Sequence, residues 1–267
     1  RLVKRADPSI RTLVTASLEP SLLDAVDLWA PNLNCLWIKS HAGEFCPWRA
    51  PRSSYDQLLE KGSLLWWYQS CSSHGCAADE GASSGAPQAA GPTDGAAADA
   101  YFRGWPTYVI DAPGTRTRIM GWLAFAHGIG GELYWDTVQA YSPDGSPRDP
   151  WEGASLRSFG GNGDGTLLYP GTPARIGGTT HVPVISLRLK QIRDGLEDHE
   201  LLRLVARTKD GAEAARRAVL ELAPTPFRVQ DDPLALERVR ADLLDRLDRA
   251  SGAAPEGGRR GGSDGAR

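Results

Sequence analysis

The segment SLLWWYQ, residues 63–69, predicts a buried β-strand, because it is mostly apolar and aromatic and follows the turn-forming residue Gly62. Three other short segments are likewise rich in β-branched, aromatic or leucine residues and lie between turn formers: residues 12–15, 25–29 and 132–138. Their spacing suits parallel pairing, so we expect the four strands to form one sheet.

Helices are predicted between these strands. Ser53 is expected to cap a helix that continues to Lys61 and ends before Gly62, and the segment 115–127 is expected to form a helix that ends at Gly128. Alternation of strand and helix is the pattern of α/β proteins. Four such strands make half of a (β/α)8 barrel. Because the edges of a half-barrel would be left unpaired, we expect further barrel sequence before the first residue.

The expected fold class is therefore α/β: the C-terminal half of a TIM-like (β/α)8 barrel, followed by C-terminal helices. We assign residues 1–205 to the barrel and residues 206–250 to helices that pack on its outside. Two segments of low complexity are expected to be disordered: a loop insertion over residues 77–100 and a Gly/Arg-rich tail over residues 251–267.

The composition indicates a globular protein. The 267 residues are 41% hydrophobic, and their interspersed charges give a formal net charge of −3. Because the chain has no basic stripe, nucleic acid is not expected as a ligand. No run approaches the roughly 18 apolar residues that a membrane span requires. The opening residues 1–5 contain no initiator Met and do not resemble a signal peptide, so the sequence does not determine the cellular compartment.

Cysteine gives a weaker signal about the compartment. The sequence has four cysteines: Cys35, Cys46, Cys71 and Cys76. An even number suits two disulfides in a secreted or periplasmic protein, which we favour, but the thiols of a cytosolic enzyme would look the same and the pairing stays open. A zinc site that recruits His41 and His74 is not expected, because the cysteine spacings are unusual for structural zinc. We expect neither a metal nor a cofactor.

Tryptophan is abundant, with nine Trp against one Met and five Phe. Indole faces are what proteins place against the C–H faces of sugars, although a Trp-rich core would give the same count. Several of these residues fall at the ends of predicted strands, which favours contact with a ligand.

Five motifs, taken together and in order, resemble the catalytic domain of glycoside hydrolase family 123. They are VDLWAP at 26–31, LWWYQSC at 65–71, MGWL through GELYW at 120–135, GDGTLLYPG at 163–171, and SLRLK with RDGLEDHE within 186–200. The resemblance covers roughly residues 1–205, and motifs gain weight from such context.

The resemblance implies a bacterial enzyme with a TIM-like barrel that removes β-linked N-acetylgalactosamine with retention of configuration, and it implies a carbohydrate substrate. In such substrate-assisted hydrolases an adjacent Asp-Glu pair acts at the end of an earlier barrel strand. By the order of the motifs, this pair is expected before Arg1, so no catalytic residue is assigned within the chain. Asp79 and Glu80 are adjacent, but they lie in the low-complexity segment and are interpreted as solvated loop charge.

Substrate-binding candidates come from the carboxyl ends of the predicted strands, where barrel sites are built. They are Trp29, Asn32, Trp67, Tyr68, Asp111, Trp135 and Asp136. Alternation along a strand means that Trp66 and Trp67 face opposite sides, as do Tyr134 and Trp135. We favour Trp67 and Trp135 as sugar-stacking walls, with Trp66 and Tyr134 under helices, and the reverse register stays open.

Simpler interpretations compete with some of these roles. Asp136 either hydrogen-bonds a sugar hydroxyl or caps nearby backbone N–H groups. Residues 162–165 (NGDG) are expected to form a tight turn rather than a calcium loop, at the end of a region of turns over 142–165. A short apolar run follows at 166–169, and then another loop that ends near Pro183. The acidic run 197–200 is expected to lie on a solvated helix face.

Three functions therefore stay open at this level. The first is a family 123-like hydrolase with its acids upstream. The second is a carbohydrate-binding remnant that keeps the aromatic walls without the acids. The third is a structural or interaction domain in which the tryptophans only pack the core.

Overall fold

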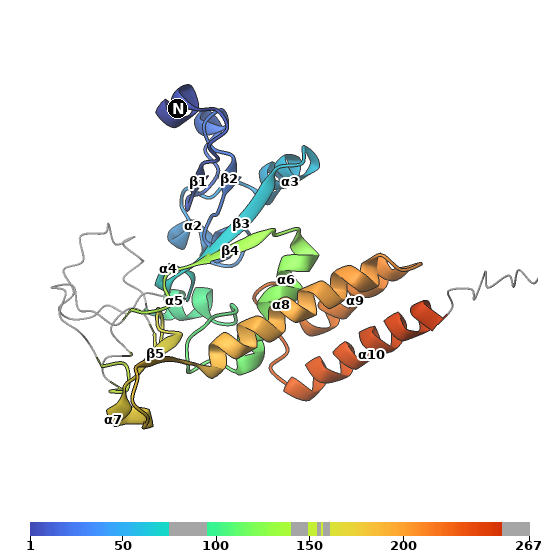
Figure 1. Cartoon of the computed structure of the whole chain (residues 1–267). Helices are drawn as coiled ribbons and strands as arrows, with labels where there is room; N and C mark the ends of the chain where they lie inside the picture. Colours follow the sequence, from blue (N-terminus) through green and yellow to red (C-terminus); the bar gives the residue numbers. More distant parts are fainter. Residues whose placement is uncertain (75–94, 140–148, 154–155, 157–160, 253–267) are drawn as a thin grey trace, which may run out of the picture.

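A computed structural model of the chain describes residues 1–74, 95–139, 149–153, 156 and 161–252, and every structural statement below refers to these residues. Its centre is a four-stranded parallel sheet with the strand order β1-β2-β3-β4 (Figure 1). The strands are β1 (Leu13–Val14), β2 (Leu28–Trp29), β3 (Leu64–Gln69) and β4 (Gly131–Tyr134). The four predicted strands and their parallel pairing are confirmed, so the chain has a mixed α/β fold.

The register explains why a glycine begins β4. Trp66 of β3 pairs with Gly131 of β4. A side chain at position 131 would put its Cβ within 2.5 Å of the Trp66 ring. Glycine at position 131 therefore leaves room for the Trp66 indole beside β4. The same ladder continues through Tyr68 and Leu133, which aligns the carboxyl ends of the two strands.

Short helices occupy the connections in the N-terminal half. They are α1 (Leu2–Ala6), η1 (Pro20–Leu22), η2 (Leu33–Cys35), α2 (Ala42–Phe45), α3 (Arg52–Glu60), α4 (Cys71–His74) and α5 (Gly95–Phe102). The predicted cap of α3 is wrong, because Pro51 rather than Ser53 precedes the first helical turn. Residues 95–100, predicted as part of a disordered insertion, instead begin α5, since their alanines favour a helix. The rest of that segment, residues 77–94, lies outside the described residues.

A disulfide joins Cys35 and Cys46, whose Cα atoms are 5.5 Å apart. It closes the segment that carries η2 and α2, and the Tyr101 hydroxyl lies 3.2 Å from Cys46 Sγ. This pair is one of the pairings that the sequence left open. The side chain of Cys71 and all of Cys76 lie outside what the structure describes.

Helix α6 (Gly114–His127) is the long connection between β3 and β4. As predicted, it ends at Gly128, which has a φ of 66° and adopts the left-handed conformation typical of a helix C-terminus. Its residues Ile119, Trp122 and Leu123 are almost fully buried. The core of the protein therefore lies between this helix and the sheet.

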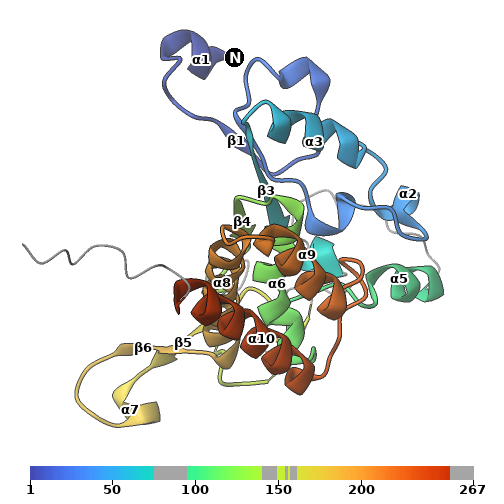
Figure 2. The same ribbon diagram turned by 90° about the vertical axis from the view of Figure 1, so that its right-hand side faces the viewer.

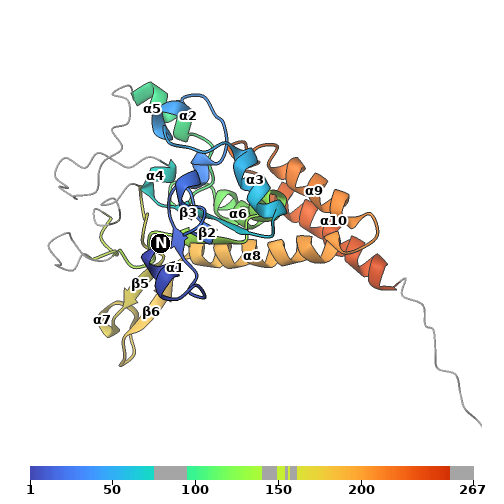
Figure 3. The same ribbon diagram turned by 90° about the horizontal axis from the view of Figure 1, so that it is seen from above.

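Three helices follow: α8 (Leu187–Ala206), α9 (Gly211–Leu222) and α10 (Pro233–Gly252). They are grouped with α6 at one end of the molecule (Figure 3). Helices α6 and α8 meet at Gly121 and Gly195, where a Cβ on Gly195 would come within 2.5 Å of the Arg118 carbonyl oxygen. The two backbones can approach this closely only because both residues lack side chains.

The region predicted as loops up to Pro183 instead contains a hairpin. Strands β5 (Leu168–Gly171) and β6 (Val182–Ile185) pair antiparallel, with α7 (Pro173–Ile176) between them. The hairpin projects from the body of the molecule (Figure 2). Pro170 opposes Pro183 in the ladder. Prolines argue against a central strand, but a two-stranded ribbon consists of edges, where proline is tolerated.

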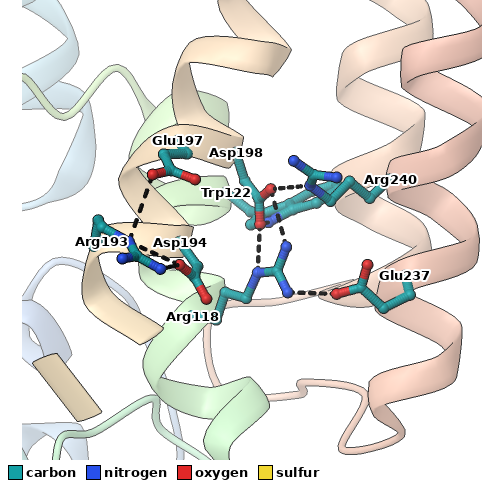
Figure 4. Close-up of polar contacts among 8 residues, drawn as sticks. All are labelled: Arg118, Trp122, Arg193, Asp194, Glu197, Asp198, Glu237 and Arg240. Carbon is teal, nitrogen blue, oxygen red and sulfur yellow. Dashed lines mark hydrogen bonds and ion pairs between the residues drawn. The ribbon is translucent and has the colours of Figure 1, made fainter. Parts of the chain in front are cut away.

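A buried carboxylate joins α6, α8 and α10 (Figure 4). Asp198 is fully buried and accepts hydrogen bonds from Arg118 Nε at 2.7 Å, Trp122 Nε1 at 3.0 Å and Arg240 Nε at 2.8 Å. The expected solvated face of the run 197–200 is therefore wrong for Asp198. Its neighbour Glu197, with a side chain 60% exposed, fits that expectation.

We predict that Asp198→Asn lowers the free energy of unfolding by about 3–5 kcal/mol, because it leaves two partly buried guanidinium groups without their shared anion. Urea denaturation measures the change. Asp194→Asn is the matched control: Asp194 lies one turn earlier and pairs with the exposed Arg193, so its loss should cost less than about 1 kcal/mol. Equal effects of the two substitutions would contradict a structural role for the Asp198 cluster.

Candidate functional site

The carboxyl ends of β2, β3 and β4 lie side by side and form the candidate site. Asn32, just beyond β2, forms an isolated parallel bridge with Tyr68. The Trp135 backbone N–H, just beyond β4, donates to the Gln69 carbonyl at 2.9 Å. The structure thus brings three predicted residues, Asn32, Tyr68 and Trp135, to one edge of the sheet, where α/β proteins place their ligands.

A chain of buried polar side chains lies at this edge, centred on Asp164. The Tyr134 hydroxyl donates to Asp164 Oδ1 at 2.8 Å and accepts from the Gly165 N–H at 2.7 Å. His74 Nε2 lies 3.3 Å from Asp164 Oδ2. The other ring nitrogen of His74 is 3.2 Å from Thr107 Oγ1. Because a buried carboxylate needs donors, this chain fixes four separate segments against one another.

The turn that carries Asp164 is built as the sequence predicts. Gly163 and Gly165 have φ values of 80° and 70°, conformations that favour glycine. The buried guanidinium of Arg188 donates to the carbonyl oxygens of Gly163 at 2.6 Å and Thr166 at 2.5 Å. It also donates to the Tyr108 carbonyl at 2.6 Å. The first turn of α8 therefore holds the turn in place.

The electrostatics of the site keep its phenols neutral. Burial raises the pKa of Tyr134 well above its usual range, and the nearby Asp164 charge raises it further. Burial likewise raises the pKa of Tyr68, and Asp164 contributes in the same direction. Both hydroxyls therefore stay protonated at neutral pH, and that of Tyr134 is already used in its hydrogen bond to Asp164. Among the described residues no group of three or more His, Cys, Asp and Glu is placed to hold a metal ion.

Two predicted acids lie near this edge. Asp136 accepts hydrogen bonds from the backbone N–H groups of Thr137 and Val138, the latter at 2.6 Å, which matches the alternative of a turn cap. Asp111 is exposed and accepts from Asn162 Nδ2 at 2.9 Å. Asp111 is therefore attached to the same turn that carries Asp164.

The aromatic candidates divide into exposed and buried ones. Trp135 is 51% exposed, whereas Trp29 is 2% exposed and belongs to the core. The favoured orientation of Trp67 is wrong: it is fully buried, and the alternation of exposure along β3 places it on the side of Leu65 and Gln69. Gln69 donates to Met120 of α6, so this face lies under the helix. Helix α6 covers the more apolar face of β3, and the less buried Trp66 takes the opposite face.

Glu132 of β4 shares the helix-covered face with Trp67. A small cavity of about 100 Å³ lies there, lined by Trp67 of β3, Glu132 of β4, Tyr108 of the segment before α6, and residues of α6 and α8. Burial raises the pKa of Glu132 to about 7, while hydrogen bonding with Tyr108 and Trp67 acts in the opposite direction. This acid is therefore largely protonated below neutral pH.

His74, Asp164 and Glu132 were all missed as candidates. His74 follows β3 by a few residues and Asp164 lies between two glycines. Chain order gives no sign that these two side chains meet. Glu132 interrupts an otherwise apolar strand, and that break in the pattern was the available signal.

We predict that the change in the free energy of unfolding caused by Glu132→Gln is more favourable at pH 8 than at pH 5. The folded-state pKa of about 7 lies above the ordinary value of 4.5. The protonated Glu132 therefore costs the folded state nothing below about pH 4.5. As the pH rises from there to about 7, the unfolded chain ionises first, and the free energy of unfolding falls by up to about 3 kcal/mol. The amide removes this loss. Urea denaturation at both pH values measures it, with the exposed Glu197→Gln as control; an equal effect of Glu132→Gln at both pH values would refute the prediction.

Comparison with protein-family models gives a match within the chain. The family model of the glycoside hydrolase 123 catalytic domain matches residues 99–205. The matched segment contains α6, β4, most of α8 and the residues Tyr134, Trp135 and Asp164. No curated protein matches the chain. The resemblance seen in the motifs is confirmed over this segment, since residues 99–205 match the model of the glycoside hydrolase 123 catalytic domain.

Proposed function

We propose that the chain is the C-terminal half of a TIM-like barrel glycoside hydrolase that removes terminal β-linked N-acetylhexosamine, with N-acetylgalactosamine favoured, and that it retains the anomeric configuration. Residues 1–205 would form the barrel part, and residues 206–250 the helices that pack on it. The match to a glycoside hydrolase catalytic domain supports the reaction class. The parallel order of β1 to β4 supports the barrel.

One observation carries the proposal. In the segment that matches the family, an exposed tryptophan, Trp135, directly follows β4 and lies beside the buried chain of Tyr134, Asp164 and His74. An aromatic wall backed by a rigid polar layer at the carboxyl ends of parallel strands is the arrangement of a sugar-binding site. Described helices include none that is long and apolar enough to cross a membrane.

The proposed reaction uses the substrate as its own nucleophile. The 2-acetamido carbonyl oxygen attacks the anomeric carbon and the bond to the leaving oxygen breaks. A carboxylate stabilises the oxazolinium-like ion, and a neighbouring acid protonates the leaving oxygen. Water then attacks the anomeric carbon from the face that the leaving group has vacated, the bond to the acetamido oxygen breaks, and the deprotonated acid takes the proton of the water, which retains the configuration. We propose that an Asp-Glu pair outside these 267 residues supplies both acids. Asp79 and Glu80 are adjacent in the sequence but lie outside the described residues.

Residues of this chain would bind and orient the sugar. Trp135 would stack on a C–H face of the ring. Asn32 has a buried side-chain oxygen without a hydrogen-bond partner among the described residues. We propose that this side chain turns toward the bound sugar and accepts from one of its hydroxyls. Asp111 and Asp136 are acceptors at the same edge, and Tyr68 is a neutral donor. The arrangement also suits a carbohydrate-binding protein that lacks the catalytic acids. The assay below distinguishes such a protein from a hydrolase.

The test compares two forms of the protein: the 267 residues alone, and a longer form that extends upstream of Arg1 through an Asp-Glu pair at the end of a strand. We expect the longer form to release p-nitrophenol from its β-N-acetylgalactosaminide and the 267 residues alone to release none. Activity of the 267 residues alone would refute the assignment of the acids. Silence of both forms, with binding of N-acetylgalactosamine retained, would favour the binding protein.

In the active form, we predict that Trp135→Ala lowers kcat/KM about tenfold, because stacking on an aromatic ring contributes on the order of 1 kcal/mol. Trp48→Ala is the control, since Trp48 is 84% exposed and lies in the loop before α3. If Trp135→Ala behaves as Trp48→Ala does, Trp135 does not contact the sugar.

A further inference from the structure

A second exposed aromatic surface lies where Trp151, from the segment 149–153, packs against the β5–β6 hairpin. The rings of Trp151 and Tyr169 are 5.1 Å apart, with their planes inclined at 53°. Trp151 is 38% exposed, and its Nε1 donates to the Pro170 carbonyl at 2.9 Å. The indole is therefore fixed on β5 by a hydrogen bond while a large part of it faces solvent.

Charged groups surround this indole. Arg175 Nη2 lies 2.5 Å from Asp149 Oδ2 and 3.5 Å from Glu152 Oε1. The side chains of Asp149, Glu152 and Arg175 are 40%, 68% and 45% exposed. Asp149 Oδ1 also accepts from the Trp151 N–H at 2.9 Å, which holds the carboxylate beside the ring. A fixed aromatic ring with donors and acceptors around it can bind a sugar by its C–H face and by its hydroxyls.

Arg188 connects this surface to the strand ends. Its Nη2 lies 3.4 Å from the Tyr169 hydroxyl and 2.5 Å from the Thr166 carbonyl oxygen. The same guanidinium holds the turn that carries Asp164. An antiparallel bridge between Val138 and Thr166 joins this strand to the segment after β4. The two surfaces are thus parts of one rigid assembly.

We propose that Trp151 and Tyr169, with Asp149, Glu152 and Arg175, form a second carbohydrate site that binds the saccharide to which the terminal N-acetylhexosamine is attached. This inference rests on the proposed function, and it makes the substrate a neutral oligosaccharide rather than a single sugar with a small leaving group. Two carboxylates against one guanidinium give the surface a net negative charge, which disfavours sulfated or sialylated chains.

The test is isothermal titration of the protein with two probes: a neutral trisaccharide that ends in β-linked N-acetylgalactosamine, and N-acetylgalactosamine alone. We expect Trp151→Ala to raise the Kd of the trisaccharide about tenfold and to leave the Kd of the monosaccharide unchanged. Trp151→Phe, which keeps an aromatic face, should restore most of the affinity and exclude misfolding of the hairpin. Trp48→Ala should change neither value.

The inference is overturned if the wild-type chain binds both probes equally, or if Trp151→Ala matches Trp48→Ala. It is also overturned if Trp151→Ala weakens both probes alike. Failure of the proposed function is distinct: it would be seen as loss of hydrolysis in every form of the protein while the effect of Trp151→Ala on trisaccharide binding persists.

Discussion

The close crossing of α6 and α8 is the contact on which the rest of the molecule depends. Gly121 and Gly195 leave no side chain at the crossing, so the two backbones touch. One turn further along α8, Asp198 reaches Arg118 and Trp122 of α6. The glycines set the distance and the carboxylate sets the register. A carboxylate buried among three helices is tolerable only with this complete set of donors.

The position of α8 on α6 also determines the geometry of the candidate site. Its middle is fixed to α6 through Gly195 and Asp198, and its first turn carries Arg188. Arg188 donates to carbonyl oxygens on both sides of Asp164, so the position of the helix determines the position of the turn. Tyr134 and His74 then meet Asp164 from the ends of β4 and α4. The strand-end residues and the hairpin surface are therefore oriented by the same helix that packs on the core.

Local sequence patterns predicted most strands, helix ends and turns well, but they predicted poorly which segments pack against one another. The four strands, the end of α6 at Gly128 and the glycine turn at 163–165 follow from apolar runs and glycine placement. The β5–β6 hairpin was missed because prolines at 170 and 183 oppose a strand assignment unless both strands are known to be edges. The side of Trp67 was wrong because two adjacent tryptophans are equally apolar. Only the position of α6 decides between them.

The same alternation on β3 supports the proposed barrel. Leu65, Trp67 and Gln69 are buried under α6, whereas Leu64 on the other face is 46% exposed and Trp66 and Tyr68 are half-buried. A large apolar face in contact with water costs free energy that a closed barrel would recover, because its inward-facing residues pack against those of other strands. Parallel sheets are usually covered on both faces. A face on which, among the described residues, Leu64 is exposed and Trp66 and Tyr68 are only half-buried is what the inner wall of such a barrel would present.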